Sequence, residues 1–202
     1  MTSPVYWQPW LYRLCMRLLY GPHFEGRYGS VASLISEGAS VFEACAGDCY
    51  LFDKYLRHIT LRYTAGDINP RFVKHGKKRG IDIIRHDVLR DDIPDSDYVI
   101  MQGSLYQFVP RHEEIVGRLR AACRRRVVIS ESVVNLAASP HPLVRFIARR
   151  STNAGAGACA RRFSETTLDE FFGRFCRNCV DTSYLAPGGR DKIYVLFGER
   201  RR

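Results

Sequence analysis

Apolar runs alternate with helix-forming segments along most of the chain, and this alternation is the strongest constraint on its fold. Short apolar runs of the kind that form buried strands cover Ser40–Cys45, Leu61–Ala65, Ile81–Ile84, Tyr98–Met101 and Arg126–Ser130. Segments with apolar residues at helical spacing lie between them, over Asp48–His58, Pro70–Arg79 and Arg111–Cys123. Strand–helix alternation of this kind predicts a parallel sheet that is covered by helices on both faces.

The C-terminal part of the chain departs from this alternation. Two apolar runs, Val180–Leu185 and Ile193–Phe197, flank the turn sequence Pro187–Arg190 and predict an antiparallel hairpin. The helix that precedes them has Ser164 as its N-cap candidate. We therefore expect an α/β fold, a three-layer αβα sandwich whose seven-stranded sheet is mostly parallel and ends in an antiparallel hairpin.

Two segments lie outside this core. Residues 1–37 are interpreted as an N-terminal helical cap, with helices over Trp10–Tyr20 and Ser30–Ser36. Residues 137–162 are rich in Pro, Gly and Ala and are interpreted as a lid-like excursion with one helix at Leu143–Arg150. A chain of 202 residues is long enough for one well-buried domain, so we expect a single domain with its core over residues 38–198.

The composition narrows the class of protein. No run of apolar residues is long enough to span a bilayer, and the start lacks the pattern of a secretory signal. The seven cysteines are odd in number and scattered, which favours a reducing, cytoplasmic location over a disulfide framework. Four cysteines could in principle bind one zinc ion, namely Cys45, Cys49, Cys176 and Cys179. We expect instead that they are small buried side chains and that the protein binds no metal.

Acidic residues follow three of the predicted strands. Glu43 closes the first strand and precedes a turn of small residues around Gly47. Asp67 follows the second strand, and Asp87 follows the third. Since the carboxyl ends of parallel strands meet at one edge of a sheet, these acids predict a site for a nucleotide-like cofactor.

The order of these elements resembles the class I S-adenosylmethionine-dependent methyltransferase family over residues 38–198. In that family the first strand ends in an acid followed by G-x-G-x-G. Glu43 matches the acid and Gly47 the central glycine, while Cys45 and Cys49 stand in place of the outer glycines. The terminal hairpin also favours this family over nicotinamide dehydrogenases. The acids alone do not separate the two families, because a dehydrogenase could equally use Asp67 to bind a ribose.

The resemblance implies S-adenosyl-L-methionine as the cofactor and assigns residues to it. Asp67 would bind the ribose hydroxyls, because a carboxylate accepts two hydrogen bonds at once. Asp87 and Val88 would bind the adenine, and the exit of the fourth strand would lie beside the methionine part. The implied cofactor-binding set is Glu43, Ala44, Cys45, Gly47, Asp67, Ile68, Asp87, Val88, Gln102 and Gly103.

The methyl acceptor is less constrained. Methyl transfer from an activated sulfur depends mainly on positioning, with proton transfer where the acceptor needs a base. His23, Tyr106 and Glu131 are the catalytic candidates, since each can exchange a proton or a hydrogen bond near the strand ends. The short chain, its cap and its excursion favour a small-molecule acceptor in a lidded pocket.

Two alternatives stay open at this point. The formal charge of +10 is compatible with an RNA or other nucleic-acid methyltransferase, although the basic residues are spread along the chain and are not interleaved with aromatic ones. The two cysteines in the glycine positions are compatible with a catalytically inactive module that binds the cofactor. The sequence does not predict an oligomeric state.

Overall fold

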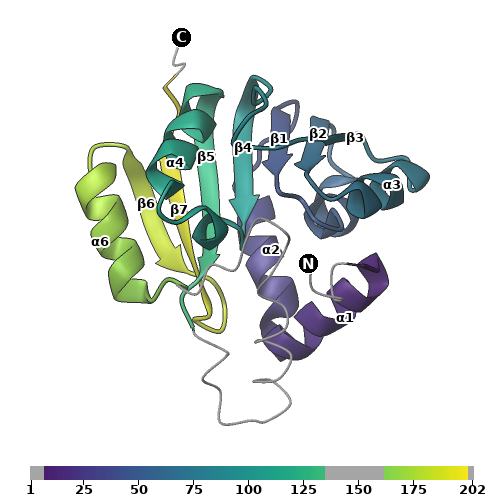
Figure 1. Ribbon diagram of the computed structural model, residues 1–202, viewed down its shortest axis with the longest axis horizontal. Coiled ribbons are helices and arrows are strands. Elements are labelled where there is room, and N and C mark those ends of the chain that lie inside the picture. The colour runs from purple at the N-terminus through teal and green to yellow at the C-terminus, as the bar shows by residue number, and fades with distance from the viewer. Residues whose placement is uncertain (1–6, 135–161, 200–202) are drawn as a thin grey trace.

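The computed structural model describes residues 7–134 and 162–199, which form a mixed sheet with helices on both faces (Figure 1). The strands are β1 (Ser40–Ala44), β2 (Arg62–Asp67), β3 (Ile83–Arg85), β4 (Ser96–Gln102), β5 (Cys123–Ser132), β6 (Val180–Leu185) and β7 (Asp191–Phe197). The helices are α1 (Pro9–Tyr20), η2 (Gly21–His23), α2 (Phe24–Ala32), η3 (Phe52–Leu56), α3 (Pro70–Lys78), η4 (Leu105–Phe108), α4 (His112–Ala121) and α6 (Glu165–Phe175).

The sheet confirms the predicted architecture. Its strand order is β3-β2-β1-β4-β5-β7-β6. The first five strands pair in parallel, and β7 runs antiparallel to both β5 and β6. The parallel half therefore brings the carboxyl ends of β1 to β5 to one edge, and the hairpin completes the sheet on one side.

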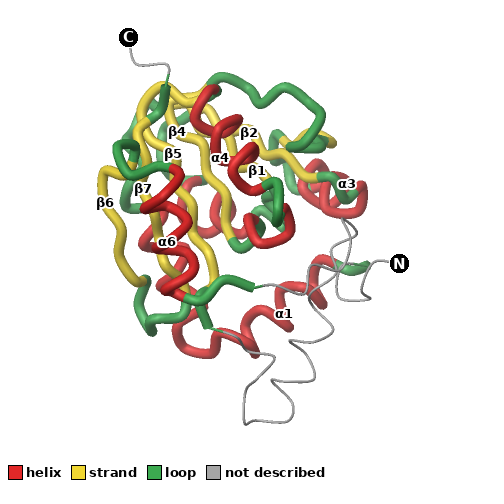
Figure 2. The backbone as a smooth tube through the Cα atoms, turned by 60° about the vertical axis from the view of Figure 1, so that its left-hand side comes forward, coloured by secondary structure: helices red, strands yellow, loops and turns green. Residues whose placement is uncertain are grey.

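Both faces of the sheet are buried at its central strands β1, β4, β5 and β7, which explains their nearly continuous apolar runs, whereas the edge strand β6 is largely exposed. On one face, Phe42 and Met101 pack beneath α4 and α6. On the other, Val41 and Ile100 pack beneath α2 and the turn that contains η3. The two helical layers lie on opposite sides of the strands, so the molecule is a three-layer sandwich (Figure 2).

The N-terminal helices lie at the carboxyl edge of the sheet. In Figure 1 the arrowheads of β4 and β5 point toward α1 and α2, which cross below the strand ends. The cap predicted for residues 1–37 thus includes two helices, although the second is α2 (Phe24–Ala32) and not Ser30–Ser36. The difference arises because Phe24, Tyr28 and Val31, at helical spacing, pack into the core and draw the helix toward the N-terminus.

Other element boundaries also differ from the predicted ones. The helix expected at Asp48–His58 is shorter and contains the π-helical turn η3. The helix expected at Arg111–Cys123 ends at Ala121, because Cys123 already pairs with Ser96 as the first residue of β5. The predicted N-cap is confirmed, since the Ser164 hydroxyl accepts from the Thr167 amide at 3.2 Å. The predicted excursion and its helix at Leu143–Arg150 fall on residues 135–161, outside the described residues.

Candidate functional site

A small cavity lies at the carboxyl edge of the sheet, between β1, β4, β5 and the N-terminal helices. It encloses about 60 Å³. Six of the residues singled out in the sequence line it: Glu43, Cys45, Gln102, Gly103, Tyr106 and Glu131. Because these residues come from three strand ends and the loops after them, the parallel register of the sheet is what brings them together.

The loop after β1 has an unusual backbone. Cys45, Gly47 and Cys49 have φ angles of 56°, 57° and 55°. These values lie in the left-handed region, which glycine adopts freely and other residues adopt at a cost on the order of 1 kcal/mol. The two cysteines therefore hold the backbone shape expected of a G-x-G-x-G loop, although the residue type at both positions resists it.

Asp67 ties this loop to β2. Its Oδ2 accepts a hydrogen bond from the Gly47 amide at 2.8 Å, and its Oδ1 accepts one from the Asn69 amide at 2.8 Å. The side chain is buried, and burial raises its pKa to about 6 despite both hydrogen bonds. The carboxyl group is thus held rigidly between the end of β2 and the centre of the loop.

Glu43 is buried at the end of β1. The Tyr63 hydroxyl donates to its Oε2, and the Gln102 Nε2 donates to its Oε1 at 3.3 Å. Desolvation raises its pKa to about 7, so the group takes up or releases a proton near neutral pH. The same Gln102 has a buried Oε1 that accepts no hydrogen bond from any described residue. A buried acceptor without a donor costs free energy, so Gln102 is suited to a ligand that donates.

The remaining predicted cofactor residues lie outside the cavity. Ala44 and Val88 are buried in the core beneath α4. Ile68 is 48% exposed at the surface beside Asp67. Asp87 is partly exposed, and its Oδ1 accepts from the Leu89 amide at 3.0 Å in the loop after β3.

The three catalytic candidates occupy different environments. Tyr106 and Glu131 line the cavity, whereas His23 does not and packs against Gly188 in the turn between β6 and β7. Glu131 accepts hydrogen bonds from the amides of Leu105 at 2.7 Å and Ser132 at 3.2 Å. Burial raises the pKa of Glu131 to about 7, and the negative charge of the nearby Asp191 is the second-largest cause of this rise.

The structure adds a buried ion pair that the sequence did not indicate. Arg27 of α2 lines the cavity, and its Nε lies 2.6 Å from Oδ2 of Asp191 at the start of β7. The Tyr20 hydroxyl donates to the other oxygen of Asp191 at 3.1 Å, and the Arg27 guanidinium stacks 4.2 Å from the centre of the Tyr20 ring. No local pattern predicts this cluster, because its members come from opposite ends of the chain.

Helix α1 closes the cavity from outside. Tyr12, Met16, Leu19 and Tyr20 of this helix contribute to the wall. Arg13 fixes the helix to the loop after β1, since its Nε donates to Asp48 Oδ2 at 2.7 Å. Gly47 lies next to the Tyr12 ring: a Cβ added to this glycine would be 3.7 Å from Cε1 of Tyr12.

No family model and no curated protein matches the sequence. Solved structures do match the fold. Mitomycin 7-O-methyltransferase superposes with a TM-score of 0.64 at 18% identity, over 96% of this chain and 59% of that one. Magnesium protoporphyrin IX methyltransferase from Synechocystis PCC 6803, with bound S-adenosylhomocysteine (SAH), gives 0.62 at 15% identity, over 92% and 93%. This chain has the class I methyltransferase fold.

A third structure supports the same assignment of the fold. Human N-acetylserotonin methyltransferase, in complex with S-adenosylmethionine (SAM), superposes with a TM-score of 0.62 at 14% identity, over 96% of this chain and 58% of that one. The present chain therefore spans just under three fifths of the human and mitomycin enzymes, and nearly the full length of the Synechocystis enzyme.

Proposed function

We propose that this protein is a SAM-dependent methyltransferase that acts on a small molecule. The observation that carries the proposal is the left-handed backbone at Cys45, Gly47 and Cys49, held by the buried carboxyl of Asp67. A loop with this backbone would let a nucleoside approach closely, and it follows β1 at the carboxyl edge of the parallel strands, where ligands of such folds usually bind.

The residues at this edge fit the cofactor. Each oxygen of Asp67 accepts one hydrogen bond from the backbone and has a further lone pair for a ribose hydroxyl. The unsatisfied Gln102 Oε1, next to Glu43, suits the ammonium of the methionine part. Ile68 and the loop that carries Asp87 and Val88 would contact the adenine. The cofactor supplies a methyl group activated on a positively charged sulfur.

The cavity must enlarge to hold such a ligand. Binding sites for small molecules usually enclose about 300–1,000 Å³, and this cavity encloses about 60 Å³. Helix α1 and its Tyr12 and Met16 side chains form the outer wall, so we propose that they shift outward on binding.

The acceptor would enter on the side of Tyr106 and Glu131. Glu131 has a pKa of about 7 and can take up a proton near neutral pH from an acceptor hydroxyl or amine. Tyr106 can orient the acceptor through its ring or its hydroxyl. His23 lies outside the cavity, and we propose no step for it. A cytoplasmic location stays a prediction from the cysteine pattern.

Isothermal titration calorimetry with SAM and with SAH tests cofactor binding. We expect both to bind with micromolar dissociation constants, and no heat at high micromolar concentration would overturn the proposal. Methyl-labelled SAM, incubated with the protein and a cell extract, then separates the alternatives. Label in the small-molecule fraction supports the proposal, whereas label in RNA, or binding without any transfer, assigns the protein to one of the other classes.

A further inference from the structure

Helix α1 is apolar on two sides, and only one of them faces the protein. Its inner side buries Cys15, Leu19 and Tyr20. On its outer side, Trp10 is 64% exposed, Leu14 47% and Leu18 51%. A surface helix normally turns its apolar residues toward the core, so the exposed apolar side of α1 lacks a partner among the described residues.

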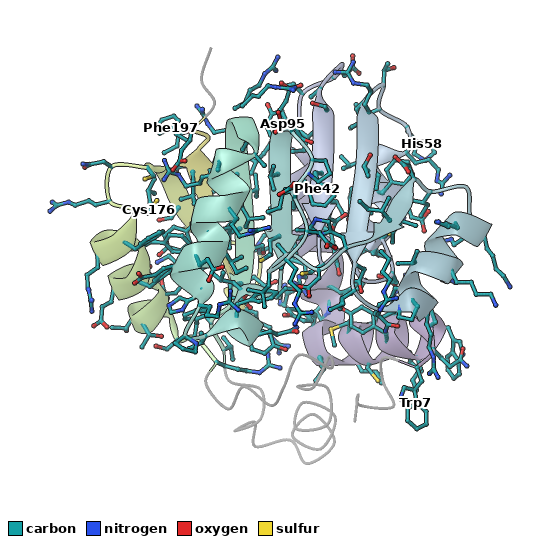
Figure 3. All side chains as sticks on the ribbon, turned by 45° about the horizontal axis from the view of Figure 1, so that its top comes forward. Trp7, Phe42, His58, Asp95, Cys176 and Phe197 are labelled. Atoms are coloured by element: carbon teal, nitrogen blue, oxygen red, sulfur yellow. The ribbon has the colours of Figure 1, made fainter. Side chains whose placement is uncertain are left out.

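The exposed side chains form one continuous stripe. Trp10, Leu14 and Leu18 are four residues apart and therefore follow one side of the helix for about 12 Å. Trp7, 48% exposed, extends the stripe beyond the N-terminus of α1 and points away from the body of the molecule (Figure 3). Single exposed apolar residues are ordinary, but four large ones in a row mark an interaction surface.

The neighbouring helix α3 carries exposed basic side chains. Helix α3 lies beside α1, where the Tyr12 and Phe72 rings pack 5.4 Å apart. The exposed cations of α3 are Arg71, Lys74, Lys77 and Lys78, none of which pairs with an acid of the described residues. Arg71 also stacks on Trp7, 5.7 Å from the ring centre.

A groove of about 270 Å³ joins the two helices. Trp10 and Leu14 line one side of it. Arg13, Arg17 and Arg79 line the other, and each of these arginines is ion-paired with an acid that does not line the groove. The surface therefore presents the apolar stripe of α1 next to the unpaired cations of α3, and no carboxylate lines the groove between the two helices. A partner that fits it must offer both apolar groups and negative charge.

We propose that the outer side of α1, with the cations of α3, docks onto an anionic lipid surface. Tryptophan and leucine bury in the boundary between headgroups and acyl chains, while lysine and arginine remain among anionic headgroups. The 12 residues of α1 are too few to cross a bilayer, so the helix lies in the plane of the surface. Within the described residues, no helix is long and apolar enough to span a membrane.

The lipid surface accounts for the features better than RNA does. An RNA would pair with the cations and could stack on the tryptophans, but it would leave Leu14 and Leu18 in water. A bilayer buries all four apolar side chains at once. The inference rests on surface residues and does not depend on the proposed cofactor.

Intrinsic fluorescence offers a direct test, because the only two tryptophans of the chain are Trp7 and Trp10. The full-length protein is titrated with vesicles of equal parts phosphatidylcholine and phosphatidylglycerol. We expect a blue shift of tryptophan emission, and quenching by lipids brominated on the acyl chains. Vesicles of phosphatidylcholine alone should bind at least tenfold more weakly, since they lack the charge that the lysines require.

Two sets of variants separate the apolar and basic contributions in vesicle co-sedimentation. Leu14→Ser/Leu18→Ser should weaken binding tenfold or more, and Lys74→Glu/Lys78→Glu should weaken it by at least about fivefold for each lysine. Two variants serve as matched controls. Leu185→Ser changes an exposed leucine of β6, and Arg62→Glu changes an exposed cation at the start of β2, at the amino edge of the sheet and away from α1. Both controls should bind as the parent protein does.

Several results would overturn the proposal. One is unchanged emission with anionic vesicles, whether or not a single-stranded RNA shifts it. Another is equal loss of vesicle binding in the Leu185→Ser or Arg62→Glu controls, which would show that the surface is not specific. A third is a stable dimer in sedimentation velocity that dissociates in Leu14→Ser/Leu18→Ser, with no binding to vesicles, which would assign the stripe to a second copy of the chain.

Discussion

The inner and outer parts of the proposed cofactor site are built differently. Glu43, Cys45 and Gln102 line a closed cavity beneath α1, whereas Ile68 and Asp87 lie partly in solvent at the ends of β2 and β3. Both parts come from the same sheet edge, so the register of the parallel strands explains which residues gather there. What differs is the cover, which is supplied by a helix that precedes the sheet in the chain. Asp67 lies at the border of the two parts.

The largest effect is expected at this border. Asp67→Ala removes the carboxyl that holds the Gly47 amide and that we assign to the ribose. Hydrogen bonds to a charged group contribute about 1.5–3 kcal/mol, which corresponds to a roughly 10- to 150-fold weaker SAM affinity. Calorimetry measures the affinity, and circular dichroism verifies that the variant is folded. An unchanged dissociation constant in the folded variant contradicts the assignment.

The inner part should also make stability depend on pH. Burial raises the pKa of Glu43 and of Glu131 to about 7, and that of Asp67 to about 6. In the unfolded chain these carboxyls have pKa values near 4. At a pH between about 4 and the raised pKa of each group, the folded state therefore binds more protons than the unfolded state. The free energy of unfolding should therefore fall as pH rises from about 4.5 to 7, by up to about 1.4 kcal/mol per pH unit for each carboxyl.

Urea denaturation at a series of pH values measures this slope. Glu131→Gln and Glu43→Gln should each flatten it, because each removes one group with a raised pKa. Asp169→Asn is the matched control outside the cavity, since the pKa of Asp169 is lowered and its titration lies below the window. A stability that rises with pH across the window would show that the buried carboxyls are not the controlling groups.

A smaller effect is expected from the backbone of the loop. At Cys45, with φ of 56°, glycine is free of the strain that any residue with a Cβ bears. We expect Cys45→Gly to be more stable than Cys45→Ala by about 1 kcal/mol, the reverse of the order at an ordinary position. Thermal unfolding of the two variants compares them directly, and a more stable alanine variant would refute the left-handed conformation.

The smallest effect is expected in the outer part. Asp87 is partly exposed and already accepts a hydrogen bond from the Leu89 amide. A solvated hydrogen bond to the adenine adds about 0.5–1 kcal/mol at most, so Asp87→Ala should weaken SAM binding less than about fivefold. A loss as large as that of Asp67→Ala would show that ligand binding closes the outer part as well.

Much of this architecture could be predicted from the sequence, because it depends on local patterns. The apolar runs and turn residues indicated the strands, and the acids at their ends indicated the site edge. Asp67 in particular was predicted to lie near the loop after β1, because residues at the ends of neighbouring parallel strands must lie close together, and it does contact the Gly47 amide.

The features that escaped prediction depend on contacts between distant parts of the chain. Arg27, which lines the cavity, forms an ion pair with the buried Asp191, and neither residue is distinguished from other charged residues by its neighbours in sequence. Tyr12 was interpreted only as part of a cap, and nothing local indicates that it lies against Gly47. Cys45 and Cys49 resist positive φ, so tertiary packing overrides a local preference at both.

The thiol of Cys45 forms part of the wall that would face the sulfonium of the cofactor. Thiolates accept methyl groups readily, so an ionised cysteine beside a bound SAM would be methylated and would then block the proposed site. Burial raises the pKa of Cys45, with the charges of Asp67 acting in the same direction. These surroundings therefore keep the sulfur protonated and a poor nucleophile, so the residues that we propose to bind the cofactor would also protect the protein from it.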